Sequence, residues 1–481
     1  PVTNDSILNS VFAVNTGDFI ATALRWSPRF GFNWTPHDGS AVRGGAGLFT
    51  GRVAYSWLSF AFSNTGNDAA LITCSGAAAP NFVADPDAQP SACGGPTVKP
   101  LAAVTYFDRT FKLPQTLKAS LGGDQRLPWG VVLSADVLYQ RGVDELYISD
   151  DNLKGPITLL SGEGGRVMYG TVAATSTNGA LPAVTPAKVS TAFGPILRNS
   201  SRSGDRSLTV VLQAQKRFAD AMEFTAAYAH TRAEDQLSLR DAQTVSNYGF
   251  VPVNGTLQDR ELVTSVFSIP NKITLSGTAN VPAGFTFSVI YLGQSGLPYT
   301  YIVNGDANGD GVGNLVAPFD RQQDDAVYVP RNPSDIALVR DSGAVLVADP
   351  AASAALEQFI GGESCLEKAR GIILPRNSCH NPWINQLNAR VGKTVLLPGR
   401  HRAEVTLDVF NVLHLLNDSW GLVRQTGTFA GAGTENVPLL KLRGHDGTFD
   451  RNLYQLTLPA RSAVNVDASR WRLQLGARYS F

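Results

Sequence analysis

Apolar and polar residues alternate in several stretches of this chain, and the C-terminal stretch shows the pattern most clearly. Its apolar residues occupy every second position, and polar residues or glycine lie between them: Trp471, Leu473, Leu475, Ala477 and Tyr479 alternate with Arg472, Gln474, Gly476, Arg478 and Ser480. Because successive side chains of a β-strand point to opposite faces, this stretch predicts a strand with one apolar and one polar face. A half-buried strand of a soluble protein has the same pattern, so repetition along the chain has to separate the two interpretations.

Five pairs of such stretches, each joined by a short turn, predict β-hairpins. The paired segments are 26–34 with 41–51, 117–126 with 131–139, 208–217 with 224–228, 272–281 with 285–291, and 384–392 with 402–409. Together with the C-terminal strand they give about eleven strands.

The connections between these hairpins are long and polar, whereas the turns inside the hairpins are short. Compact soluble domains rarely contain such long connections. Outer-membrane barrels combine short periplasmic turns with long extracellular loops, because lipid leaves no backbone group unpaired and irregular chain must stay outside it. We therefore expect an all-β fold, namely an antiparallel transmembrane β-barrel.

The odd number of strands bears on where the chain starts. If the short turns and the C-terminus are periplasmic, eleven crossings place the first residues outside the cell. Residues 1–25 are then part of an extracellular loop, and residues 26–481 are barrel strands with their loops. The chain also begins at Pro1 without the segments of an export signal. We expect the C-terminal part of a barrel domain, whose eleven strands form an open, curved sheet.

Composition narrows the function classes. Lys plus Arg and Asp plus Glu number 40 each, so the zero net charge gives no basis for a nucleic-acid partner. No apolar run is long enough for a transmembrane helix. The six histidines lack the spacing of metal ligands, and no GxSxG, HExxH or P-loop motif occurs. We therefore expect a protein that is not an enzyme.

The four cysteines form two local pairs, Cys74 with Cys93 and Cys365 with Cys379, each in a stretch rich in Gly, Pro and Ser. Neither pair has the CxxC spacing of a metal or redox site. Two loop disulfides are expected in an oxidising compartment, and four free thiols are the alternative.

One loop resembles a calcium-binding turn, because oxygen-bearing side chains at alternate positions precede a glycine: Asp306, Asn308, Asp310 and Gly311. The twelfth position of the motif is Ala317 and supplies no ligand, so Asp324 or Asp325 would have to contribute it. The alternative is a polar turn on an exposed loop without metal. No other cofactor is expected.

A short helix is predicted inside a later loop. Asp349 is a suitable N-cap, Pro350 suits the first helical position, and Gly361 and Gly362 follow the apolar segment that ends at Ile360.

Three segments resemble the barrel half of Oar-like TonB-dependent receptors, and the likeness covers most of the chain. They are SPRFGFN (27–33) with RGGAGLF (43–49), FKLPQTLK (111–118) running on to DNL (151–153), and RNSCHNPW (376–383). Such receptors have an N-terminal carboxypeptidase-regulatory-like domain, a plug and a barrel of 22 strands. The resemblance implies a gram-negative outer-membrane transporter that takes up a large or scarce solute. It also implies that the TonB complex energises uptake through a plug that is not in this sequence, with outer-membrane lipid as the surroundings.

The C-terminus resembles the signal that the barrel-assembly machinery reads. The matching positions are a polar residue, a glycine two residues later and two aromatic residues: Gln474, Gly476, Tyr479 and Phe481. The resemblance therefore implies this machinery as a further partner.

Two alternatives stay open at this point. One is an outer-membrane adhesin or structural barrel that transports nothing, from which a plug and a TonB-contacting segment upstream would distinguish a receptor. The other is a secreted soluble β-rich binding protein, which would bury its apolar faces and need no detergent.

Overall fold

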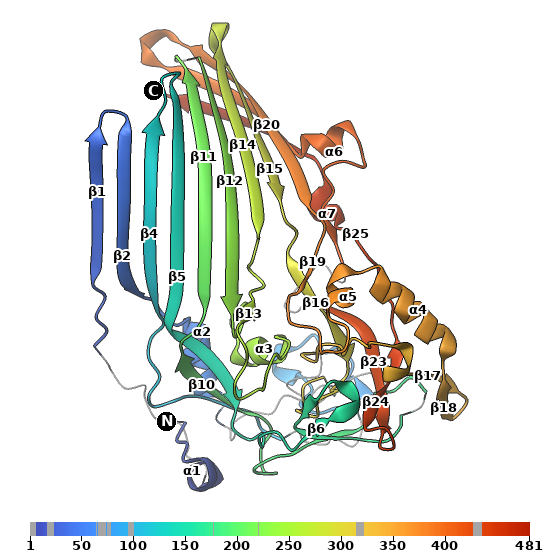
Figure 1. The fold of residues 1–481 in the computed structure, drawn as a ribbon. Coiled ribbons are helices and arrows are strands. Elements are labelled where there is room, and N and C mark those ends of the chain that lie inside the picture. Colours follow the sequence, from blue (N-terminus) through green and yellow to red (C-terminus); the bar gives the residue numbers. More distant parts are fainter. Residues whose placement is uncertain are drawn as a thin grey trace.

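The computed structural model describes residues 6–16, 24–63, 65, 74, 78–94, 101–176, 178–219, 221–313, 322–426 and 435–481. Its largest element is an antiparallel sheet in which the strands lie in chain order. Within the described residues the path of this sheet has eleven strands: β1 (Arg29–His37), β2 (Ser40–Thr50), β4 (Gln115–Arg126), β5 (Val131–Asp150), β11 (Arg206–Phe218), β12 (Met222–Asp235), β14 (Asn271–Val281), β15 (Phe285–Gln294), β20 (Ile384–Leu396), β21 (Arg402–Phe410) and β26 (Arg472–Ser480). Figure 1 shows the short turns and the C-terminus at one end of these strands and the long connections at the other.

The sheet is open, as expected, because in the described part of the chain its terminal strands β1 and β26 each pair with one neighbour and not with each other. All five predicted hairpins are present. The first one reverses later than expected, since His37 still pairs with Ser40. In two of the turns a proline precedes a residue with positive φ. This residue is Gly399 (φ 76°) in one turn and Ala283 (φ 67°) in the other, and only glycine adopts that conformation without steric cost.

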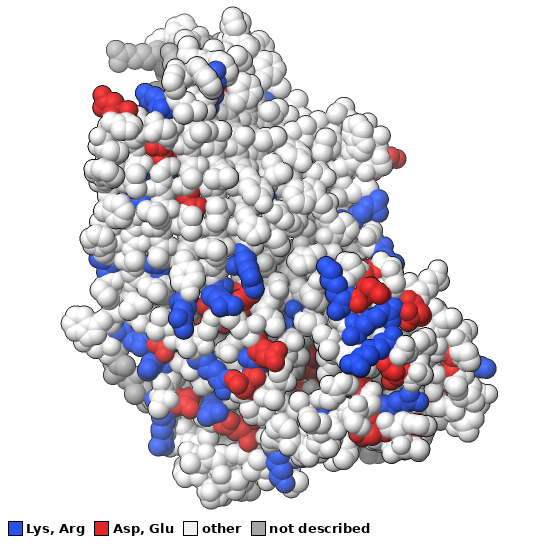
Figure 2. All heavy atoms as spheres, viewed as in Figure 1, with Lys and Arg blue, Asp and Glu red and all other residues white. Residues whose placement is uncertain are grey.

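The apolar face continues from strand to strand because the register places apolar residues opposite one another. One row runs from Leu475 through Leu407 and Val391 to Phe287. This face is uncovered: Leu475 is 77% exposed and Phe287 is 44% exposed. In Figure 2 charged side chains gather over the loop end, and few lie over the strands. A soluble sandwich or propeller would bury such a face, so its exposure favours contact with lipid over the soluble alternative.

The long connections fold together at one end of the sheet into what we call the loop layer. Its main element is a six-stranded sheet, in the order β18 (Val345–Ala348), β17 (Ala337–Ser342), β24 (Arg451–Leu456), β23 (Asn436–Asp446), β16 (Pro298–Asn304) and β19 (Cys379–His380). β16 pairs with β23, and β17 pairs with β24, in parallel. Strands from the connection after β15 and from the connection after β21 therefore build one sheet together.

Smaller elements complete the loop layer. The remaining strands are β3 (Val104–Phe107), β10 (Ile196–Arg202), β13 (Val263–Thr264), β6 (Thr158–Leu160), β7 (Arg166–Met168), β8 (Gly170–Val172), β9 (Val184–Pro186), β22 (Arg424–Gln425) and β25 (Ala463–Val464). The α-helices are α1 (Ser6–Phe12), α2 (Tyr55–Ser63), α3 (Thr244–Gly249), α4 (Pro350–Gly361), α5 (Ser364–Lys368), α6 (Val412–Leu416) and α7 (Val466–Ser469). A helix both long and apolar enough to cross a membrane is absent from the described residues.

The expectation that the connections are simply polar segments is wrong, because they enclose apolar cores. The largest core contains Tyr301, Val303, Leu439 and Leu442, each almost fully buried. The reason is physical: the strands of the main sheet have an exposed apolar face, so in the described residues the water-excluded cores form where the connections pack on one another.

The predicted helix is confirmed as α4. The Asp349 side chain accepts the N–H of Ala352, Pro350 is the first helical residue, and the helix ends at Gly361. Its residues Leu356, Phe359 and Ile360 pack into the core of the loop layer.

Both cysteine pairs form disulfides, Cys74–Cys93 and Cys365–Cys379. The second joins α5 to β19 across a separation of 14 residues. Closing a loop of this length stabilises the folded state by about 3 kcal/mol, chiefly by restricting the unfolded chain.

Replacing Cys365 and Cys379 together by alanine is expected to destabilise the loop layer by about that amount while leaving the strands of the main sheet in place. Limited proteolysis of the detergent-solubilised protein measures this, with faster cleavage within residues 350–380 as the expected result. Unchanged cleavage rates would show that packing alone holds this region.

Candidate functional site

The polar face of the main sheet carries charges that pair across neighbouring strands. Arg43 on β2 forms ion pairs with Asp124 on β4 and with Asp136 on β5, the latter with 2.9 Å between Nη2 and Oδ1. Arg390 on β20 donates from Nε to Asp408 Oδ1 on β21 at 2.5 Å. The arginines are largely exposed to solvent, so these pairs add little to the stability of the fold. Their main effect is a polar surface that water can wet.

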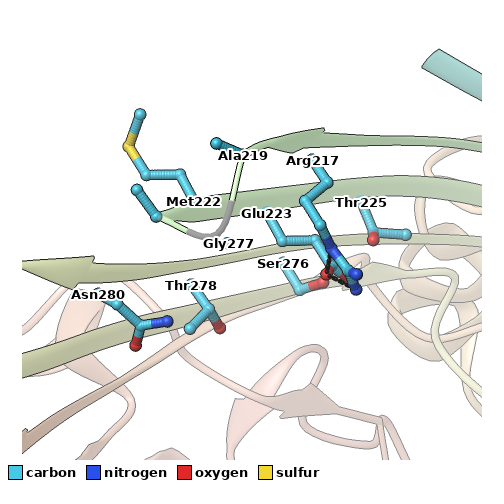
Figure 3. A pocket seen from close by; sticks show the side chains of 10 residues that line it. Arg217, Ala219, Met222, Glu223, Thr225, Ser276, Gly277, Thr278 and Asn280 are labelled. Carbon is cyan, nitrogen blue, oxygen red and sulfur yellow. Dashed lines mark hydrogen bonds and ion pairs between the residues drawn. The ribbon is translucent and has the colours of Figure 1, made fainter. Parts of the chain in front are cut away.

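Figure 3 shows a hollow on this polar face, beside the turn between β11 and β12. Its volume is ≈ 420 Å³, and Ser276 and Thr278 of β14 line it with hydroxyl groups. Glu223 accepts hydrogen bonds from Arg217 Nη2 and Gln215 Nε2, both at 2.6 Å. Because the carboxylate is already engaged, the hollow offers hydrogen-bonding groups rather than a free charge. It suits water or an uncharged polar group.

The predicted calcium loop is buried within the loop layer. Asp306, Asn308 and Asp310 are 1%, 4% and 6% exposed, so the turn is buried, whereas the interpretation without metal placed it on an exposed loop. The Asp306 carboxylate accepts the N–H groups of Gly309, Asp310 and Gly311, and Asn308 Oδ1 accepts the N–H of Asp310 at 2.8 Å. These bonds fix the turn.

Two other connections close over this loop. The backbone N–H of Tyr169 donates to the Asn308 carbonyl at 2.8 Å. Asn452 donates from Nδ2 to the Ala307 carbonyl at 3.0 Å. The loop is therefore a junction at which three connections of the chain meet.

Carboxyl groups accumulate at this junction. Burial raises the pKa of Asp310 to about 7, and the neighbouring charge of Asp325 adds to the effect. Burial also raises the pKa of Asp306 and of Asp324 well above their ordinary values, and Asp310 is the strongest charged influence on both. Each of these acids would be more stable with a proton or a cation beside it.

A buried ionic network lies next to the loop. Arg166 donates from Nε to Glu163 Oε2 at 2.8 Å and from Nη1 to Asp325 Oδ1 at 3.4 Å. The Tyr454 hydroxyl donates to the same glutamate, 2.8 Å from Oε2. Asp325 in turn accepts the N–H of Ala307 at 2.6 Å. The sequence suggested Asp324 or Asp325 as a further metal ligand, whereas in the structure Asp325 links the loop to Arg166.

Glu163, Arg166 and Tyr454 were not identified from the sequence. No local motif marks them, because Glu163 and Tyr454 are separated by 291 residues and meet only through the loop layer. An Arg three residues after a Glu occurs in many sequences, so this spacing does not predict the network.

The C-terminal residues of the predicted assembly signal lie on an edge strand. Gln474 and Gly476 pair with Asp408 and Thr406 of β21. The ring of Tyr479 stacks on His401 with 5.6 Å between centroids, and Phe481 is 96% exposed beyond the end of β26. The C-terminus thus lies at the end of the sheet where the short turns lie (Figure 1).

Comparison with known proteins gives one family assignment. The sequence pattern of a family described as "Outer membrane beta barrel domain" matches residues 7–418. No curated protein matches the chain.

Several solved structures are similar to this chain at low identity. The outer membrane transporter YddB from Escherichia coli is 12% identical, with 94% of this chain and 40% of that chain covered and a TM-score of 0.41. A mutant of the ferric enterobactin receptor PfeA from Pseudomonas aeruginosa is 9% identical, with 95% and 40% covered and a TM-score of 0.38. The ferric citrate transporter FecA is 10% identical, with 94% and 38% covered and a TM-score of 0.36. The chain thus spans about two fifths of the length of each of these proteins.

Proposed function

This chain belongs to the outer membrane beta barrel domain family, and we propose that it is part of the barrel of an Oar-like, TonB-dependent uptake receptor. The protein is located in the outer membrane of a gram-negative bacterium. In this proposal the eleven strands are the C-terminal half of a barrel of 22 strands. Segments 27–33, 43–49, 111–118 and 376–383, which resemble the Oar-like receptors, support the subtype.

The main support for the proposal is that the loop layer at one end of the main sheet is folded. Long extracellular loops are the rule in outer-membrane barrels, but closing the strands does not require these loops to fold on one another. Here two connections share a six-stranded sheet, and α4, a disulfide and a buried ionic network add to it. Such a rigid outer surface above a polar interior suits capture of a solute from outside the cell.

Transport through such a barrel requires that the solute leaves the outer surface and passes along the polar face. Paired charges such as Arg43 with Asp136 and Arg390 with Asp408 keep this face wet without leaving a strong net charge. We propose that the TonB complex supplies the energy through a plug outside this sequence. The solute is a large or scarce one, and no catalytic step is needed.

The test compares the producing bacterium with a strain that lacks this gene, each with and without a protonophore. Mass spectrometry of the spent medium identifies solutes that only the parent strain depletes. The proposal predicts at least one such solute, whose depletion stops when the protonophore collapses the proton gradient. Depletion that continues under the protonophore would contradict energised uptake. Equal depletion by both strains, with reduced surface attachment of the deletion strain, would favour the adhesin.

We further propose that Gln474, Gly476, Tyr479 and Phe481 are read by the barrel-assembly machinery. The support is their placement: β26 is an edge strand of the described sheet, and Phe481 projects freely beyond it. A strand with one free edge and an exposed aromatic end can be recognised by another protein through strand pairing.

A further inference from the structure

Asp325 accepts the N–H groups of Ala307 and Asn308 in the calcium-like loop, and two residues close to it in the chain have unpartnered oxygen atoms. Both carboxylate oxygens of Asp324 and the Oε1 atom of Gln322 are buried without a hydrogen-bond partner in the described part of the chain. Asp324 is only 1% exposed and Gln322 only 5%. A buried carboxylate without a partner is costly, because it loses its hydration and gains nothing in return. All three orphaned atoms are oxygens, so the missing partner is a donor of hydrogen bonds or a cation.

The nearby arginines do not supply that partner. Arg260 is the buried cation whose charge acts on Asp310 and Asp324. However, its Nη atoms donate to backbone carbonyl groups, with Nη1 at 2.8 Å from the Val251 oxygen, its Nε is itself buried without a partner, and it forms no ion pair with a carboxylate among the described residues. Arg166 is engaged by Glu163 and Asp325. Asp324 therefore has neither an ion pair nor a hydrogen-bond partner among the described residues, and Asp310 has no ion pair although its carboxylate accepts hydrogen bonds from Asn308 Nδ2 and the N–H of Val312.

We propose that Asp310 and Asp324 bind a calcium ion, with amide oxygens of Asn308 and Gln322 as further ligands. Calcium accepts six to eight oxygen ligands from carboxylates, amides and water in flexible geometry. Among the described residues, no group of three or more His, Cys, Asp or Glu side chains is arranged to hold a metal ion. The proposed site differs from such a group, since it has two carboxylates and takes its other ligands from amides and water.

Asp306 has a different role in this site. Its oxygens accept three backbone N–H groups, so it shapes the turn that presents Asn308 and Asp310. The ion would sit at the junction of three connections and hold the loop layer together. This role is independent of whether the protein takes up a solute.

The test is a thermal unfolding series on the detergent-solubilised protein, with EGTA or with excess calcium, on the wild type and on Asp324→Asn. Removing the charge of Asp324 relieves repulsion when no ion is present and removes a ligand when one is present. The proposal therefore predicts a crossing: Asp324→Asn has the higher Tm in EGTA and the lower Tm in calcium. Asp418→Asn, an exposed aspartate of the same layer, should follow the wild type in both conditions.

Isothermal titration gives a second readout. Calcium should bind the wild type and Asp418→Asn with the same affinity. Its affinity for Asp310→Asn and for Asp324→Asn should be lower by about tenfold or more. Magnesium should bind poorly, because it loses its bound water reluctantly. If a variant fails to fold, the wild type alone still tests the site: bound terbium should luminesce, and added calcium should displace the terbium and reduce the signal. Absence of both calcium heat and displaceable terbium signal in the folded wild type would overturn the proposal, as would a calcium-dependent Tm shift that Asp324→Asn retains in full.

Discussion

Replacing Leu275 by arginine is expected to keep most of the protein from reaching its folded form in the outer membrane. Leu275 lies in the middle of β14 on the apolar face, opposite Ala226 and Tyr291, and is 44% exposed. If this face contacts acyl chains, an arginine near the middle of the bilayer costs about 2–4 kcal/mol. Heat-modifiable gel mobility of purified outer membranes measures the folded fraction, and urea unfolding in lipid vesicles measures the free energy of unfolding.

The neighbouring residue provides a matched control. Ser276 is next in the chain but points to the opposite face, where it lines the polar hollow of Figure 3. Ser276→Arg adds the same side chain on the same strand and should assemble close to normally, because the added charge remains in water. Equal losses for the two variants would mean that strand distortion, and not lipid contact, explains the defect.

Replacing Phe481 by alanine is expected to reduce the folded protein in cells sharply without changing its stability once folded. The side chain is 96% exposed, so its removal sacrifices almost no packing. Any large loss must then come from recognition of the C-terminal strand during assembly. The measurement pairs the amount of heat-modifiable protein in outer membranes with the unfolding midpoint of protein refolded in detergent.

Trp129→Ala is the control for Phe481→Ala. Trp129 is also an exposed aromatic residue, 76% exposed, and lies in the turn between β4 and β5 at the same end of the strands. It should accumulate normally. Similar losses for both variants would point to a general need for aromatic residues at this membrane surface. Normal amounts of Phe481→Ala would remove the basis for an assembly signal.

The strands of the main sheet were predictable from the sequence because their environment is periodic. A strand between an apolar and a polar surface alternates with period two along its whole length, and the short turns carry proline and glycine. The helix α4 was predictable for another local reason. Asp349, Pro350 and Gly361 mark its ends directly in the sequence.

The loop layer was not predictable in the same way. Its strands are short, and β16 has buried residues on both faces, so the alternation disappears. Its pairings are also non-local: β16 lies parallel to β23, and β17 lies parallel to β24, which no turn between them specifies. Composition suggested polar loops, whereas the fold depends on scattered apolar residues that meet only in three dimensions.

The buried acidic loop lies between these extremes. The spacing of Asp306, Asn308 and Asp310 is visible in the sequence, because a turn around an ion is a local structure. Its burial is not visible, and neither are the orphaned oxygens of Asp324, since both result from other connections packing over the loop. The motif therefore suggested oxygen ligands for a cation, whereas the burial of these residues became apparent only from the fold.

One face of the main sheet is expected to contact acyl chains, and the other is expected to contact water. Spin labels on single cysteines along β21, in protein reconstituted into lipid bilayers, test this most directly. The four native cysteines are in disulfides and do not compete for the label. The account predicts that oxygen reaches labels at one set of alternate positions and a water-soluble nickel complex reaches the other: Ala403, Val405, Leu407 and Val409 against Glu404, Thr406 and Asp408. Accessibility that does not alternate with a period of two would contradict this expectation. So would a first set of labels that neither oxygen nor the nickel complex reaches.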